Sequence, residues 1–138
     1  MKDLMNCINV KRVLSPVSVA DNTAQVGQVI DGQNAASLTY IIATGSLGDA
    51  GAEFTALLEE CDTSGGTYTA VADADLLGTE ALASFIQSDD DKCFKLGYIG
   101  KKRYTRLTIT PTNNATAALI AAVAILQPGL LPAANPPA

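Results

Sequence analysis

The residue types that most often carry catalysis are scarce in this chain. It contains no histidine, which removes the commonest general base, the usual zinc ligand and every Ser-His or Cys-His nucleophile pair. The three cysteines, Cys7, Cys61 and Cys93, are an odd number and lack CxxC spacing. We therefore expect free thiols, with one disulfide as the alternative.

Two loops match ligand-binding motifs only in part. GSLGDAG (45–51) is rich in glycine but lacks both the lysine of a phosphate-binding loop and GxGxxG spacing, which favours a hairpin loop. DADLLGTE (73–80) begins like a calcium loop, but Leu77 stands at position five, where the motif requires an oxygen donor, and Ser84 stands at position twelve, where it requires a bidentate Glu. The sequence therefore predicts no metal, no cofactor and no enzymatic activity.

The positive charge of the chain is concentrated in one short segment. Residues 13–91 hold thirteen acidic residues and no basic one, whereas residues 92–138 hold six basic residues and no acidic one; the net charge is −5. Four of the nine basic residues lie within six positions, and they are the candidate partner-contacting residues: Lys101, Lys102, Arg103 and Arg106.

Three interpretations of this basic segment remain open. It could pair with an acidic strand of the same fold and gain cross-strand charge pairs. It could instead dock on an acidic protein partner, where charge complementarity would fix the orientation. Contact with nucleic acid is the third interpretation, and the acidic remainder of the chain opposes it by repelling a polyanion.

Alternating apolar and polar residues predict short β-strands separated by turns. Residues 53–61 alternate in this way before a glycine-rich turn, with a helix as the alternative. Residues 115–126 suit a strand buried on both faces, although their alanine content also suits a helix. The predicted strands are 17–20, 25–30, 37–44, 53–61, 67–71, 92–100, 102–110 and 115–126, with turns or loops at 31–34, 45–51, 62–66 and 111–114 and a short helical turn within 73–91.

About eight short strands in 138 residues indicate a single all-β domain, a sandwich or barrel. We expect an N-terminal arm at 1–16, a β-sandwich domain at 17–127 and a Pro-rich C-terminal tail at 128–138. The longest apolar run, 117–126, is about half of the roughly 20 residues that cross a bilayer, so no membrane contact is expected.

The order of motifs along the chain resembles that of the capsid cement, or decoration, proteins of tailed bacteriophages, such as the cement protein of a short-tailed phage. GYIG (97–100), a basic pair and RYTRLTIT (103–110) are followed by a turn, an Ala/Val-rich strand and a Pro-rich tail. Upstream, LTYIIATG (38–45) precedes EFTALLEECDTSGGTYTAV (53–71). The resemblance covers about residues 25–128, and SDDDKCF (88–94) departs from the family pattern.

This resemblance implies a role and no reaction. It implies a jelly-roll β-sandwich of about eight antiparallel strands with extended termini that forms a homodimer. Such a protein would bind the major capsid protein on the outer surface of an HK97-fold shell and cement neighbouring capsomers against the pressure of packed DNA. It would be made in the host bacterial cytoplasm and reside in the virion, without direct contact with nucleic acid. The alternatives are a tail, fibre or connector component, and a ligand- or carbohydrate-binding β-sandwich module.

Overall fold

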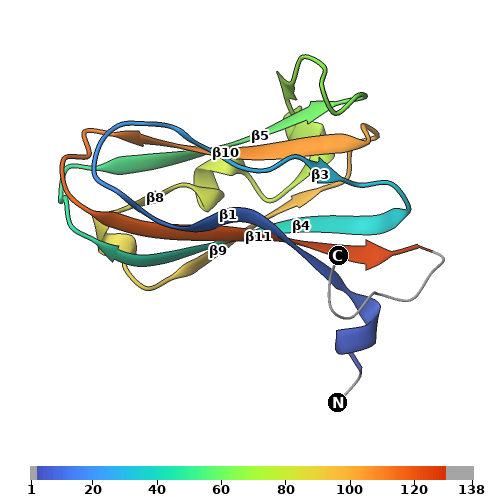
Figure 1. Ribbon diagram of the computed structural model, residues 1–138, viewed down its shortest axis with the longest axis horizontal. Coiled ribbons are helices and arrows are strands. Elements are labelled where there is room, and N and C mark those ends of the chain that lie inside the picture. The colour runs from blue at the N-terminus through green and yellow to red at the C-terminus, as the bar shows by residue number, and fades with distance from the viewer. Residues whose placement is uncertain (1–2, 130–138) are drawn as a thin grey trace.

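The computed structural model describes residues 3–129, which form two antiparallel sheets packed face to face (Figure 1). The five-stranded sheet has the order β1-β11-β4-β9-β7, and the six-stranded sheet has the order β2-β10-β5-β6 with β3 and β8 beside it. The strands are β1 (Asn9–Val19), β2 (Gln25–Val26), β3 (Ile30–Asp31), β4 (Ala35–Leu47), β5 (Glu53–Cys61), β6 (Thr69–Ala70), β7 (Leu76–Leu77), β8 (Phe85–Ile86), β9 (Cys93–Tyr98), β10 (Tyr104–Thr112) and β11 (Ala118–Pro128). The helical turns are η1 (Met5–Cys7), η2 (Asp73–Asp75), α1 (Glu80–Ala83) and η3 (Gln87–Asp89).

The strand order is that of a jelly roll. If β2 with β3 and β6 with β8 each count as one interrupted strand, and the two-residue edge strand β7 is left aside, the sandwich has eight strands. β1, β11, β4 and β9 then face β2–β3, β10, β5 and β6–β8. The all-β sandwich prediction is confirmed. None of the helical turns in residues 3–129 approaches the length or apolarity of a membrane-spanning helix.

Strand alternation builds the core, as the sequence indicated. Leu38, Tyr40 and Ile42 of β4 point inward and are buried, as are Phe54 and Leu58 of β5. Across the sandwich, the Tyr40 hydroxyl lies 2.6 Å from Thr105 Oγ1 of β10, so one buried hydrogen bond joins the two sheets. The strand prediction for 53–61 is confirmed, and so is the return of the chain, because β6 pairs antiparallel with β5.

Some predicted boundaries are wrong. Asn9–Pro16 form most of β1 and pair with β11, so they belong to the sandwich and not to an arm. The edge position of β1 and a register shift between Leu14 and Val17 explain how Pro16 fits into a strand. Gly45–Leu47 extend β4 into the predicted loop, and Pro111–Thr112 extend β10 into the predicted turn. Of the predicted tail, residues 130–138 lie outside the described residues.

The sheet edges are closed by short segments. On one side, Gly27 N donates to Leu107 O of β10 at 2.8 Å and Gln28 N donates to Val13 O of β1 at 2.9 Å, which bridges the two sheets. On the other side, the β5 amides of Ala56 and Leu58 donate to side chains from 80–84, which include α1. These contacts cover parts of the sheet edges, where unpaired backbone groups would otherwise invite strand addition by another chain.

Candidate functional site

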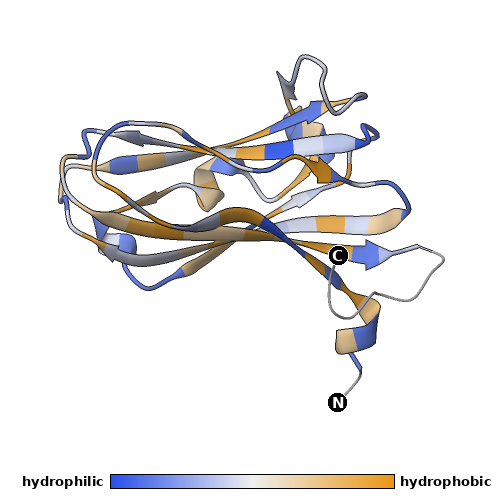
Figure 2. Ribbon diagram, in the orientation of Figure 1, coloured by the Kyte–Doolittle hydropathy of each residue, from blue (hydrophilic) through white to orange (hydrophobic). Residues whose placement is uncertain are grey.

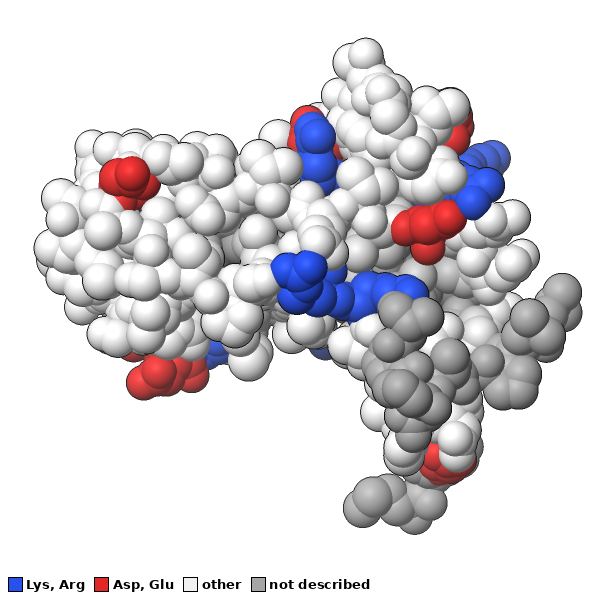
Figure 3. Space-filling view, viewed as in Figure 1, with Lys and Arg blue, Asp and Glu red and all other residues white. Residues whose placement is uncertain are grey.

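The basic segment predicted from the sequence lies at one end of the sandwich. Lys101 to Arg103 form the turn between β9 and β10, and Arg106 lies on the outer face of β10. Figure 3 shows acidic and basic side chains next to each other at the top and right of the molecule. Lys102 pairs with Asp62, Arg103 pairs with Asp31, and Arg106 pairs with Glu59.

Arg103 and Asp31 form a two-pronged pair, because Arg103 Nε and Nη2 donate to the two carboxylate oxygens at 2.9 and 2.7 Å. This hydrogen bonding holds the pKa of the Asp31 carboxyl below its ordinary value and raises the pKa of Arg103. The hydrogen bond to Asp62 likewise raises the pKa of Lys102. Three of the four candidate residues therefore have an acidic partner within the fold, and Lys101 is exposed without an ion pair among residues 3–129. Contact of the four with another molecule stays a prediction.

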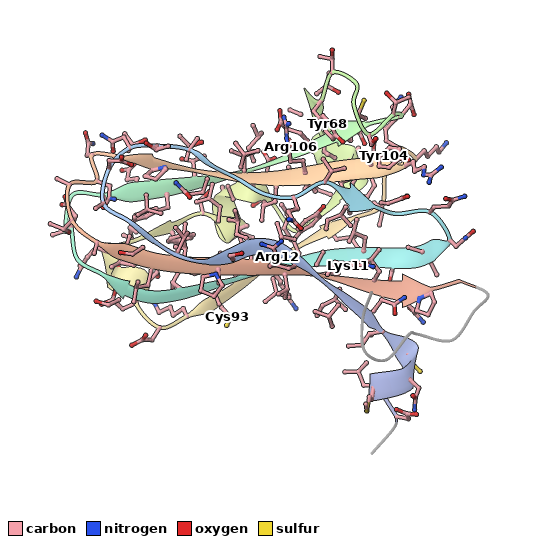
Figure 4. All side chains as sticks on the ribbon, in the orientation of Figure 1. Lys11, Arg12, Tyr68, Cys93, Tyr104 and Arg106 are labelled. Carbon is pink, nitrogen blue, oxygen red and sulfur yellow. The ribbon has the colours of Figure 1, made fainter. Side chains whose placement is uncertain are left out.

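Arg106 makes the most enclosed of these pairs. Its Nε and Nη2 both donate to Glu59 Oε2, at 3.1 and 2.8 Å, and its guanidinium lies 4.4 Å from the centre of the Tyr68 ring. Figure 4 shows Tyr68 and Arg106 together above the upper sheet. The register of β5 and β10 places Glu59 directly opposite Arg106, so this pair is a cross-strand pair of the folded sheet.

Replacing Arg106 with lysine is expected to lower the free energy of unfolding by about 1 kcal/mol, because lysine keeps the charge but loses the second donor and the flat contact with Tyr68. Urea unfolding followed by circular dichroism measures the change. Lys101→Ala is the matched control, and its effect should stay within about 0.5 kcal/mol. Equal stability of Arg106→Lys and the wild type would show that the paired geometry contributes nothing beyond charge.

The outer face of the five-stranded sheet has a different character. β11 lies between β1 and β4, and it is coloured orange over most of its length in Figure 2. Its inward residues are buried as predicted, but the prediction that it is buried on both faces is wrong, because its outward residues are half-buried or exposed. The outward apolar residues of this face are Val10, Ile41, Ala43, Leu119, Ala121, Val123 and Ile125.

The strands that make up this face carry no negative charge. No strand of the five-stranded sheet contains an aspartate or glutamate, although the chain has fourteen acidic residues. Basic residues do occur there, and in the register Arg12, Val123, Ile41 and Lys95 form one row across β1, β11, β4 and β9. We call the seven apolar residues together with Arg12 and Lys95 the apolar-basic face.

A pocket of about 320 Å³ opens on this face. Its walls are Pro16 and Val17 of β1 and Leu119 of β11, and its floor is made of small residues, Ala43 and Ala121 among them. The pocket exists because the register shift between Leu14 and Val17 interrupts the regular pairing of β1 with β11, while the small floor residues leave space beside it. It therefore offers a preformed site for apolar groups.

A second cavity, of about 520 Å³, lies at the end of the sandwich near the basic segment. Its lining includes Tyr98, whose hydroxyl donates to Glu60 Oε2 at 2.6 Å, and the exposed side chains of Leu77 and Ile99. Burial, together with the hydrogen bond to Glu60, raises the pKa of Tyr98 well above its usual value. We call this cavity the end groove.

The described residues show no constellation for metal binding or disulfide formation. No group of three or more His, Cys, Asp or Glu side chains within residues 3–129 could hold a metal ion. All three cysteines are free thiols. Cys93 lies on β9 opposite Ala43, at the border of the apolar-basic face, and Figure 4 shows it below the lower sheet, on the opposite side of the sandwich from Tyr68 and Arg106.

Sequence comparison finds no matching protein-family model and no matching curated protein. Among solved structures, the chain is similar to the CBM22-1–GH10 modules of Clostridium thermocellum xylanase Xyn10B complexed with xylohexaose, with a TM-score of 0.44 and 10% identity over 93% of this chain and 28% of that one. It is also similar to a xylan-binding domain from CBM22, with a TM-score of 0.39 and 8% identity over 94% and 91% of the two chains. Likeness at this level does not identify a ligand or partner for this chain.

Proposed function

We propose that the protein is a structural component of a tailed-bacteriophage particle, which binds the outer surface of an HK97-fold shell and cements neighbouring capsomers. The observation that carries the proposal is the apolar-basic face, a broad surface on a sheet whose other face is fixed by the core. Extended apolar surface on a water-exposed sheet is typical of a site for protein contact. The choice of a phage particle comes from the motif order along residues 25–128, which resembles that of capsid cement proteins.

The size of this face suits the role. Four strands about 4.8 Å apart, with about nine residues each at about 3.3 Å, give a flat area of roughly 600 Å². A standard protein interface buries about 800 Å² on each partner, and the relief of the side chains adds to the flat figure. Even a contact of modest affinity suffices when many copies bind one repeating lattice.

The test is the protein composition of purified phage particles from the source of the sequence. We expect a 14.2 kDa band on a denaturing gel at a ratio near one copy per shell subunit. A few copies per particle would instead assign the protein to a tail, fibre or connector. Complete absence from the particles would contradict the proposal.

A carbohydrate-binding module is the second candidate, and the end groove favours it. The groove is about 520 Å³, within the usual range for ligand sites, and combines Tyr98 with apolar and basic side chains. Saturable binding of soluble oligosaccharides, measured by calorimetry and lost in Ile99→Asp at the exposed rim of the groove, would support this candidate. Absence of binding at millimolar concentration would count against it.

A further inference from the structure

We propose that the apolar-basic face is the surface by which this protein docks, and that its partner is an acidic protein surface with an apolar centre. This inference rests on the proposed function, since the shell is taken as the partner, and it goes further by naming the face and the chemistry of the partner. It also locates the contact away from the basic segment 101–106 that the sequence indicated.

The first argument is a mismatch between sequence and burial. Strands that lie in the middle of a sheet and are covered on both faces carry nearly continuous apolar residues. β11 has such a sequence, from Ala118 to Leu126, and yet only its inner face is covered in the isolated chain. Its outward residues alternate with the core residues Ile120, Ala122 and Ala124, so they stand together on one uncovered surface.

The two outer faces of the sandwich differ in the way this proposal requires. On the six-stranded sheet, the outward residues of β5 and β10 are mostly polar, including Thr55, Thr110 and the Arg106–Glu59 pair. Such a face is stable in water without a partner. On the five-stranded sheet, aliphatic side chains occupy the equivalent positions, and Leu119 is 47% exposed.

Charge selects the kind of partner. Arg12 and Lys95 stand at the two sides of the row that crosses Val123 and Ile41, and no acidic residue of the five strands neutralises them. A two-fold dimer through this face would bring these cations from both copies into one interface, and like charges brought together in this way oppose association. An acidic surface complements the same face, because its carboxylates meet Arg12 and Lys95 while its apolar centre covers the aliphatic row.

The pocket beside Leu119 supplies an anchoring point. Residues that dominate the energy of an interface usually bury an apolar side chain in a preformed pocket near its middle. The 320 Å³ pocket lies within the apolar-basic face and is lined mainly by apolar atoms of β1, β4 and β11. The partner therefore carries an apolar side chain that enters it, with acidic groups on either side.

The native cysteines provide a footprint of the docked surface. Cys93 borders the apolar-basic face, whereas Cys61 lies on the outer face of the six-stranded sheet, opposite Tyr104. The protein is mixed with empty shells of the source phage, sedimented, and alkylated with iodoacetamide, and each cysteine is quantified by mass spectrometry. We expect alkylation of Cys93 to fall at least fivefold on shells, while that of Cys61 changes by less than twofold.

Two charge reversals complete the experiment. Lys95→Glu should weaken binding to shells about tenfold, because it places a negative charge against an acidic partner. Lys101→Glu makes the same change of charge in the exposed turn between β9 and β10, and its binding should stay within twofold of the wild type. Both lysines are exposed, so both variants should unfold at the temperature of the wild type, which checks that folding is unaffected.

The outcomes are separable. Wild-type protein that fails to sediment with shells overturns the proposed function and this inference with it. Wild-type protein that sediments while Cys93 stays reactive and Lys95→Glu binds normally overturns the inference alone, and weakened binding of Lys101→Glu would then assign the contact to the basic segment. Loss of Cys93 reactivity with protein concentration in the absence of shells would identify a second copy as the occupant and overturn the acidic-partner proposal.

Discussion

Replacing Gly27 with alanine is expected to lower the free energy of unfolding by about 3 kcal/mol. Gly27 lies where the segment that contains β2 and β3 passes between the two sheets, and its amide donates to Leu107 O. A Cβ atom at this position would lie 2.6 Å from Leu107 O and 2.7 Å from Val13 Cγ1. The first of these atoms belongs to the backbone of β10, so the clash cannot be relieved by rotating a side chain and must shift the bridge itself.

Denaturant unfolding of Gly27→Ala beside Gly65→Ala measures this effect. Gly65 lies in the exposed loop between β5 and β6, and an added Cβ would have no heavy atom within 4 Å. Gly65→Ala should therefore leave stability unchanged or raise it by a few tenths of a kcal/mol through the unfolded chain. A Gly27→Ala protein as stable as Gly65→Ala would show that the bridge between the sheets yields easily.

The second large effect is a loss of stability in alkali. Tyr40 is fully buried, and burial raises its pKa far above the usual value near 10, although the hydrogen bond to Thr105 opposes this. The stability that this raised pKa contributes is complete below pH 10 and is lost as the pH rises from 10 toward the pKa of the folded protein. The free energy of unfolding should fall by about 1.4 kcal/mol per pH unit from this one residue, or roughly 2.5 kcal/mol between pH 10 and 12.

Comparison with variants isolates the contribution of Tyr40. Tyr40→Phe should be about 1–2 kcal/mol less stable than the wild type at pH 7, because the Thr105 hydroxyl stays buried without that partner. Tyr40→Phe combined with Thr105→Val removes both polar groups and should recover most of the loss. Both variants should show a shallower alkaline decline, measured by urea unfolding between pH 9.5 and 11.5, and a decline as steep as that of the wild type would contradict the assignment.

The elements of the fold follow from local patterns in the sequence. Alternation in 37–44 predicts most of β4, and alternation in 53–61 predicts β5, because a two-residue period separates a buried face from an exposed one. The start of β1 is not visible in this way. Lys11, Arg12 and Pro16 oppose a strand locally, and only its position at the edge of the sheet and its register shift accommodate them.

The candidate site depends on pairings that a linear pattern does not encode. Arg106 and Glu59 are 47 residues apart, and only the register of β5 and β10 shows that they neutralise each other. In the same way, the apolar character of 115–126 predicts a covered strand, but the sequence does not say whether this fold or another molecule covers its outer side. The absence of acids from five strands that are scattered along the chain becomes meaningful only once the sheet order is known.

The pairing of β1 with β11 has a mechanical consequence. Asn9 lies opposite Leu126, so the outer ends of the first and last strands stand side by side at the same end of the five-stranded sheet. A force that pulls these two ends apart would break the hydrogen bonds between β1 and β11 sequentially. Because only one bond carries the load at a time, this unzipping would meet little resistance. A force spread over the face of the sheet would load many of these bonds together. The molecule should therefore resist expansion of a surface to which this face is bound far better than it resists pulling on the outer ends of β1 and β11.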